Sequence, residues 1–90
     1  MMLQPIEVIL FGAPTCRRYK TMRQRLLQTA QTLNVPLDLQ EVNDTDALSA
    51  FNPLHLPMLQ VADEIVAKAN PPSPVQLEQI FRQYLATGQF

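Results

Sequence analysis

The segment FGAPTCRRYKTM, residues 11–22, decides how this chain folds. An apolar run ends at Gly-Ala-Pro-Thr, and the only cysteine of the chain, Cys16, comes directly after it. Glycine and proline commonly mark the end of a regular element, so the sequence predicts a strand before this point and a helix after it. The single thiol therefore lies at a junction between a strand and a helix.

The residues on either side of the junction have the patterns of these two elements. Ile6–Phe11 reads IEVILF, a nearly continuous apolar run that is typical of a strand buried on both faces. After Cys16 the apolar side chains recur every three or four positions, which predicts a helix over residues 16–33. We expect Thr15 to cap its start and Asn34 to end it. The predicted buried stripe consists of Cys16, Tyr19, Met22, Leu26, Ala30 and Leu33.

The second half of the chain predicts a strand, a short helix, a hairpin and a final helix. Leu37–Val42 alternates between apolar and polar residues, as a strand with one buried face does. Asp44 and Asp46 form a capping pair before the short helix DALSAF, and MLQVADEIVAKA predicts two strands joined by a turn at residues 63–64.

The final helix has the clearest start signal in the sequence. In NPPSPVQLEQIFRQYL, residues 70–85, we expect Ser73 to cap the helix and Pro74 to take its first position. Gln76 completes a capping box with Ser73. The resulting order is β-α-β-α-β-β-α, which predicts an α/β fold with a four-stranded mixed sheet covered by helices on both faces.

The composition narrows the classes of function. The 90 residues, 47% of them hydrophobic, predict one domain, residues 1–90, with tails at 1–5 and 87–90. A formal net charge of -1 disfavours nucleic acid as a partner. We expect no membrane partner, because no apolar run approaches the ~18 residues of a span, and no signal peptide. One cysteine forms no internal disulfide, which suits the cytoplasm.

Three motifs, taken in order, resemble the thioredoxin-like superfamily in its small glutaredoxin-like form. They are the strand followed by Gly-x-Pro-x-Cys in FGAPTC, the proline before a strand in HLPMLQV, and the hairpin and Pro-Ser helix start in VADEIVAKANPPSPVQLEQIF. Together they cover residues 6–85. The resemblance implies a three-layer α/β/α arrangement, a cis bond before Pro57, and a loop at Leu56 and Pro57 that lies beside Cys16.

The resemblance also implies a redox motif and shows a departure from it. Cys16 matches the attacking cysteine of the family motif Cys-x-x-Cys, whereas Tyr19 stands in place of the second cysteine. Pro14, Thr15 and Tyr19 are then expected to line the site together with the Leu56-Pro57 loop. The phenol of Tyr19 has two interpretations: it fills the core in place of the second cysteine, or its hydroxyl binds the thiolate of Cys16.

The setting of Cys16 favours a reactive thiol. The start of a helix offers unpaired N–H groups and a positive dipole end, and five of the seven basic residues lie between positions 17 and 25. We expect Arg17 and Arg18 to stabilise the thiolate or to bind an anion. The alternative is an inert cysteine on the apolar stripe. We expect His55 to be an exposed loop residue, and no metal site, because one cysteine and one histidine are too few for closed zinc coordination.

Two functions of different class follow. In the first, Cys16 exchanges thiols and disulfides with a protein or peptide partner; no cofactor is bound, and glutathione is the expected co-substrate. In the second, the fold has lost redox chemistry and binds a peptide or protein at a surface around Tyr19 and Pro57.

Overall fold

The computed structural model describes residues 4–87 and has the predicted order of elements. A short 3₁₀ helix, η1, precedes the third strand. The expected tails fall mostly on residues 1–3 and 88–90, outside the described residues, whereas the final helix continues to Thr87, which the prediction assigned to a tail. The elements are β1 (Ile6–Phe11), α1 (Arg17–Thr32), β2 (Leu37–Val42), α2 (Thr45–Leu48), η1 (Pro53–His55), β3 (Met58–Val61), β4 (Glu64–Lys68) and α3 (Pro74–Thr87).

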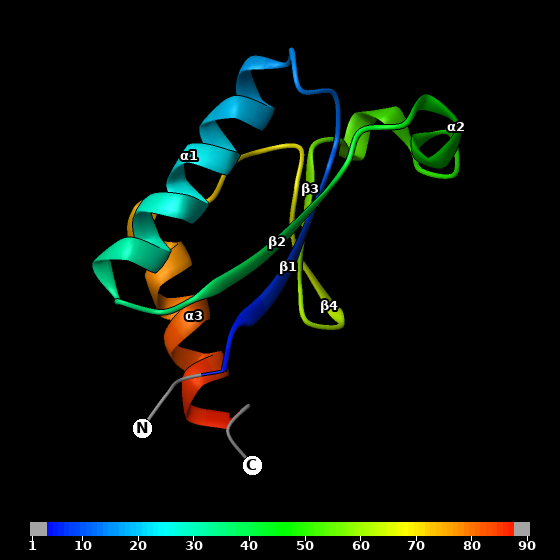
Figure 1. The fold of residues 1–90 in the computed structure, drawn as a ribbon. Coiled ribbons are helices and arrows are strands. Elements are labelled where there is room, and N and C mark those ends of the chain that lie inside the picture. The colour runs from blue at the N-terminus through cyan, green and yellow to red at the C-terminus, as the bar shows by residue number, and fades with distance from the viewer. Residues whose placement is uncertain (1–3, 88–90) are drawn as a thin grey trace.

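The four strands form one mixed sheet in the order β2-β1-β3-β4. β1 and β2 are parallel, with Phe11 opposite Val42 at their ends. β3 is antiparallel to β1, with Phe11 opposite Met58, and β4 is antiparallel to β3 with a local shift of register. The end of β1, the end of β2 and the start of β3 therefore meet at one end of the sheet, where α1 also begins (Figure 1).

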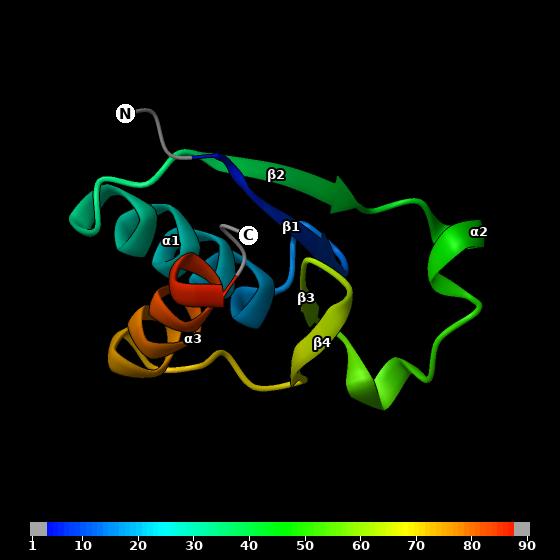
Figure 2. The ribbon, with the colours of Figure 1, turned by 90° about the horizontal axis from the view of Figure 1, so that it is seen from below.

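The core lies between one face of the sheet and the pair α1 and α3, which run side by side (Figures 1 and 2). The predicted helical stripes are confirmed, because their central residues are buried in this layer. Tyr84 of α3 also donates a hydrogen bond of 2.9 Å from its hydroxyl to the Val61 carbonyl of β3, which fixes the helix on the sheet. The buried side chains of the layer include Val8, Leu10, Tyr19, Met22, Leu26, Leu59, Val61, Leu77 and Phe81.

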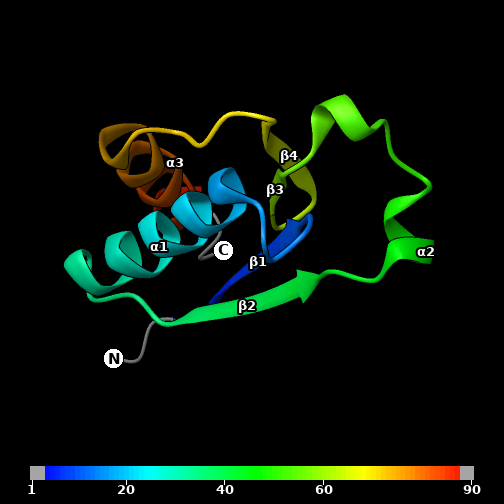
Figure 3. The same ribbon diagram turned by 90° about the horizontal axis from the view of Figure 1, so that it is seen from above.

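The opposite face of the sheet is covered by less helix than the sequence predicts. α2 is only four residues long, none of them buried, and it projects beyond the strand ends (Figure 3). The prediction that β1 is buried on both faces is therefore wrong: Ile6, Val8 and Leu10 are buried, whereas Glu7 is exposed and Ile9 half-buried. Phe11 is covered in part by the ring of Phe51, at a centroid distance of 5.1 Å.

Local chemistry explains most of the element ends, with one correction. The capping box is confirmed: the Ser73 amide donates to the Gln76 side chain at 2.9 Å, and the Gln76 amide donates to the Ser73 hydroxyl at 3.1 Å. Asp44 caps α2 as predicted. Thr15, however, is not the cap of α1. It lies within a turn closed by a 3.0 Å bond from the Cys16 amide to the Ala13 carbonyl, so the cap position moves to Cys16.

Candidate functional site

Cys16 is the last extended residue before α1. Its φ of -71° and ψ of 132° are typical of a residue that caps a helix, and its carbonyl accepts the first helical hydrogen bond, 3.0 Å from the Lys20 amide. No side chain caps this end of the helix. The thiol is partly exposed and packs against the core, so it is both supported by packing and open to solvent.

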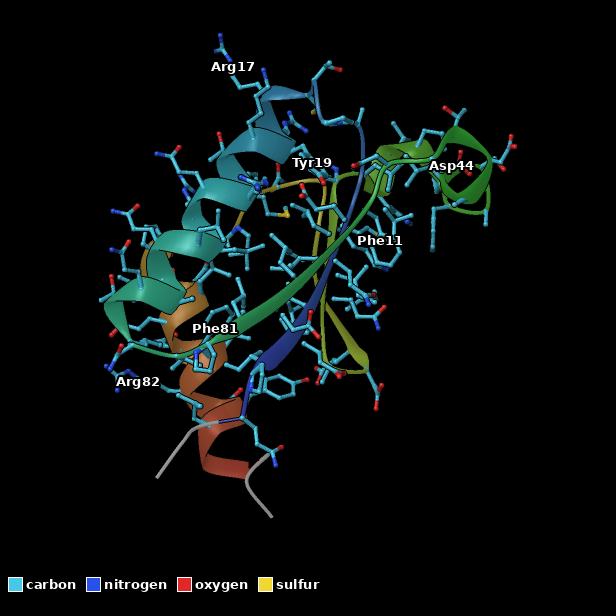
Figure 4. All side chains as sticks on the ribbon, viewed as in Figure 1. Phe11, Arg17, Tyr19, Asp44, Phe81 and Arg82 are labelled. Carbon is cyan, nitrogen blue, oxygen red and sulfur yellow. The ribbon has the colours of Figure 1, made fainter. Side chains whose placement is uncertain are left out.

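The basic residues around the thiol divide into free and engaged groups. The side chains of Arg17 and Arg18 are exposed and form no ion pair or hydrogen bond with any of residues 4–87, and Arg17 points away from the body at the start of α1 (Figure 4). Arg23 pairs with Glu41 at 3.1 Å, and Arg25 donates to the Pro72 carbonyl at 2.9 Å. The exposed side chain of Lys20 is likewise unengaged, so Arg17, Arg18 and Lys20 are the basic groups of this segment that are free to meet an anion.

Tyr19 fills the core beneath this end of the sheet. Its side chain is 1% exposed, so the interpretation of Tyr19 as a packing residue agrees with the structure. The hydroxyl donates to the Glu41 carboxylate at 2.7 Å and accepts from the side-chain amide of Asn43 at 2.9 Å, rather than binding the thiol of Cys16. Burial, supported by the Glu41 carboxylate, raises the pKa of Tyr19 to about 12, so the phenol is neutral at physiological pH.

A glycine brings the Tyr19 ring and the Pro57 loop together. A Cβ at Gly12 would lie 2.9 Å from Cδ2 of Tyr19 and 3.2 Å from Cβ of Pro57, and the φ of Gly12 is +153°. Neither the space nor the backbone suits a larger residue. Gly12 is thus a spacer that lets the end of β1 pass between the tyrosine and the proline. Its carbonyl also accepts from Asn43 at 2.9 Å.

The Leu56-Pro57 loop agrees with the resemblance in part. The peptide bond before Pro57 is cis. The Leu56 amide is not open to a ligand, because the chain turns through η1 just before it and the amide donates to the Pro53 carbonyl at 3.2 Å. The Leu56 carbonyl has no hydrogen-bond partner among residues 4–87 and remains the open backbone group of the loop.

The other predicted residues fall into two groups. Pro14 and Thr15 are exposed in the turn before Cys16, and His55 is exposed. Tyr19 and Pro57 are both buried, so the predicted docking surface around them would have to be formed by their more exposed neighbours. Of the predicted docking residues, only Leu56 is partly accessible, because the ring of Tyr19 and the ring of Pro57 pack inward on either side of Gly12.

Three residues that shape the site were not predicted as site residues: Gly12, Glu41 and Asn43. A signal for the last two was available, because the parallel pairing of β1 and β2 places the last residues of β2 and the residue after them at the same end of the sheet as the end of β1. Within the described part of the chain, no group of three or more histidine, cysteine or carboxylate side chains is placed to hold a metal ion. No helix of residues 4–87 is long and apolar enough to cross a membrane.

The cis bond before Pro57, the helix start at Cys16 and the mixed sheet together define a thioredoxin-like α/β fold. Solved structures agree, with 22 chains matching this fold. One is thioredoxin-2 of the malaria parasite, described as a component of the parasite's protein secretion machinery. It has a TM-score of 0.61 and 17% identity over 92% of this chain and 86% of that one. No protein-family model and no curated protein sequence matches the chain.

Proposed function

We propose that the protein exchanges thiols and disulfides through its single cysteine, in a reducing compartment such as the cytoplasm. The observation that carries this proposal is the position of Cys16, partly exposed at the start of α1 and followed directly in the chain by the exposed Arg17 and Arg18. The thiolate is the nucleophilic form of a cysteine, and the helix start with the two exposed cations gives an anionic thiol or disulfide substrate an electropositive surface to approach.

One thiol supports a two-stage exchange. The Cys16 thiolate attacks the glutathione sulfur of a disulfide between glutathione and a protein or peptide, and the protein leaves as a thiolate that takes up a proton. A thiolate of a second glutathione then attacks the sulfur of the bound glutathione. This step releases oxidised glutathione and restores the Cys16 thiolate. The net reaction passes two electrons from glutathione to the protein disulfide.

The need for an external thiol rests on Tyr19. In the related Cys-x-x-Cys motif the second cysteine resolves the mixed disulfide, and in this proposal Tyr19 occupies its place. The Tyr19 hydroxyl is engaged by Glu41 and Asn43, so it offers the mixed disulfide no substitute for a second thiol. Arg17 and Arg18 would then attract the carboxylates of glutathione, and the open Leu56 carbonyl would accept a hydrogen bond from an extended substrate.

A second candidate is a redox-inactive module that binds a peptide or protein. The observation that favours it is the same buried Tyr19, which in the resemblance stands where a second cysteine would be. Its binding surface would comprise Leu56 and the exposed side chains around it, such as Leu54, which is 80% exposed. Replacement of the thiol separates the two functions, because Cys16→Ser abolishes exchange but leaves partner binding intact.

The decisive experiment measures the reactivity of Cys16. At pH 7 we expect iodoacetamide to alkylate the folded protein ~10-fold faster than the same chain unfolded in urea, because unfolding removes the helix start. Exchange with a glutathionylated peptide should then be lost in Cys16→Ser. Equal alkylation rates in the two states, or exchange that survives in Cys16→Ser, would contradict the proposal.

The role of the two arginines needs a control for overall charge. Arg17→Gln with Arg18→Gln lowers the net charge by two, and so does Gln28→Glu with Gln31→Glu on the exposed face farther along α1. We expect the first pair to slow alkylation by ~3- to 10-fold and the second pair to leave it nearly unchanged. Equal slowing by both pairs would assign the effect to net charge alone.

A further inference from the structure

A hollow lies between the edge strand β4 and α3, lined by none of the residues around Cys16. It is an open groove with a volume of about 920 Å³. Residues of β4 line one side, residues 70–72 line one end, and residues of α3 line the other side. Figure 2 shows where β4, the segment that follows it and α3 lie. Arg25, the residue of α1 nearest to this end, lies nine positions after Cys16, roughly 13 Å along the helix. The groove is therefore separate from the thiol.

The charged side chains that line the groove all carry positive charge. Val66 and Ala67 of β4, together with Ile80 of α3, supply an apolar floor. The only charged side chains in the lining are Lys68 and Arg82, both cationic and on opposite walls. The side chain of Lys68 is exposed and forms no ion pair or hydrogen bond with residues 4–87, and the guanidinium of Arg82 forms only an exposed pair with Glu78. The amides of Asn70, Gln76 and Gln79 complete the lining.

The groove is held in shape by bonds already present in the structure. Arg25 of α1 donates to the Pro72 carbonyl at 2.9 Å and reaches the Pro71 carbonyl at 3.5 Å, which fixes the closed end. The capping box of Ser73 and Gln76 fixes the start of α3 just beyond it. A preformed groove loses little entropy when a ligand binds, so these contacts favour binding.

We propose that this groove binds an extended segment of a partner protein in which acidic and apolar residues alternate. β4 is the last strand of the sheet, so the backbone groups along its outer side are open to an added strand. In an extended segment alternate side chains point to opposite sides, so one set meets the apolar floor and the other meets Lys68 and Arg82. The cationic lining selects an acidic partner and disfavours a basic one.

The test titrates the isotope-labelled protein with an eight-residue peptide of alternating Glu and Val, capped at both ends. We expect chemical-shift changes at the amides of residues 66–68 and 79–80, with a Kd below ~1 mM, and weaker binding of the matching Lys and Val peptide. Lys68→Glu and Gln79→Glu should each weaken binding ~5- to 10-fold. Lys20→Glu, an exposed change of the same charge on α1, and Cys16→Ser should each stay within ~2-fold of the unaltered protein.

Several results would overturn the proposal. They are chemical-shift changes located mainly on α1, equal affinity for the basic peptide, and an unchanged affinity of Lys68→Glu for the acidic peptide. Tighter binding of an eight-nucleotide oligothymidylate would assign the groove to a phosphate polymer instead. Shifts in the groove that depend on protein concentration alone would assign it to a second copy of this chain. Because Cys16→Ser retains the groove, loss of thiol exchange and loss of peptide binding are scored independently.

Discussion

Replacing Tyr19 by phenylalanine removes one oxygen from the core and changes how stability depends on pH. The hydroxyl is hydrogen-bonded to Glu41 at 2.7 Å and to Asn43 at 2.9 Å. At pH 7 we expect Tyr19→Phe to lower the free energy of unfolding by about 1–2 kcal/mol, because these two polar partners lose a bond in a partly buried setting. The ring remains, so the packing against Gly12 is kept.

The pH dependence of the difference follows from the pKa of Tyr19. Folding raises it from 10.0 to about 12, so between these values the folded chain keeps a proton that the unfolded chain has lost. The stabilising effect is complete below pH 10 and disappears as the pH rises to 12. Two pKa units correspond to about 2.7 kcal/mol. The advantage of the unaltered protein over Tyr19→Phe should therefore vanish near pH ~11 and then reverse.

Urea unfolding followed by circular dichroism, repeated from pH 7 to pH 12 for both proteins, measures this difference. Lysine deprotonation and the ionisation of Tyr84, whose pKa burial also raises, occur in both proteins and largely cancel. The difference in tyrosinate absorbance between the two proteins gives an independent titration of Tyr19, because Tyr84 is present in both. Two stability curves that stay parallel from pH 9 to pH 12 would refute the assignment of a raised pKa to this phenol.

Three further substitutions test the local arguments. Gly12→Ala should lower the free energy of unfolding by ~3 kcal/mol, measured in urea, because its Cβ meets Tyr19 at 2.9 Å and its φ is +153°; a loss under ~1 kcal/mol would contradict the crowding. Ser73→Ala should lower it by ~1 kcal/mol through loss of the capping box, seen as a lower Tm. Arg25→Gln should speed amide hydrogen exchange at residues 69–73, and unchanged protection there would show that the arginine does not hold the loop.

Periodicity and capping chemistry were sufficient to predict most of the fold. The β1, β2 and α3 segments have patterns that short-range physics decides, and the capping box of Ser73 and Gln76 involves residues only three apart. The cap of α1 was predicted one residue too early, at Thr15 rather than at Cys16. The turn that the Cys16 amide closes with Ala13 decided between them, and it depends on the backbone after β1.

The cover of the sheet and the partners of Tyr19 depend on contacts between distant residues. An apolar run such as IEVILF indicates a strand but does not measure how much helix lies on its second face. The four-residue α2 leaves that face partly open. Glu41 is 22 positions from Tyr19, and only the register of β1 on β2 brings it to the hydroxyl. The groove beside β4 likewise depends on how α3 docks on the sheet.

The surroundings of Tyr19 bear on the proposed single-thiol chemistry. A phenol three residues after Cys16 needs space, which Gly12 provides, and polar partners, which Glu41 and Asn43 provide. A cysteine at position 19 would leave that space unfilled and the two polar side chains without this bond, so it would destabilise the fold. The tyrosine is therefore integrated into the core around the thiol. In the proposed mechanism, the protein needs an external thiol because Gly12, Glu41 and Asn43 together hold a tyrosine, rather than a second cysteine, at position 19.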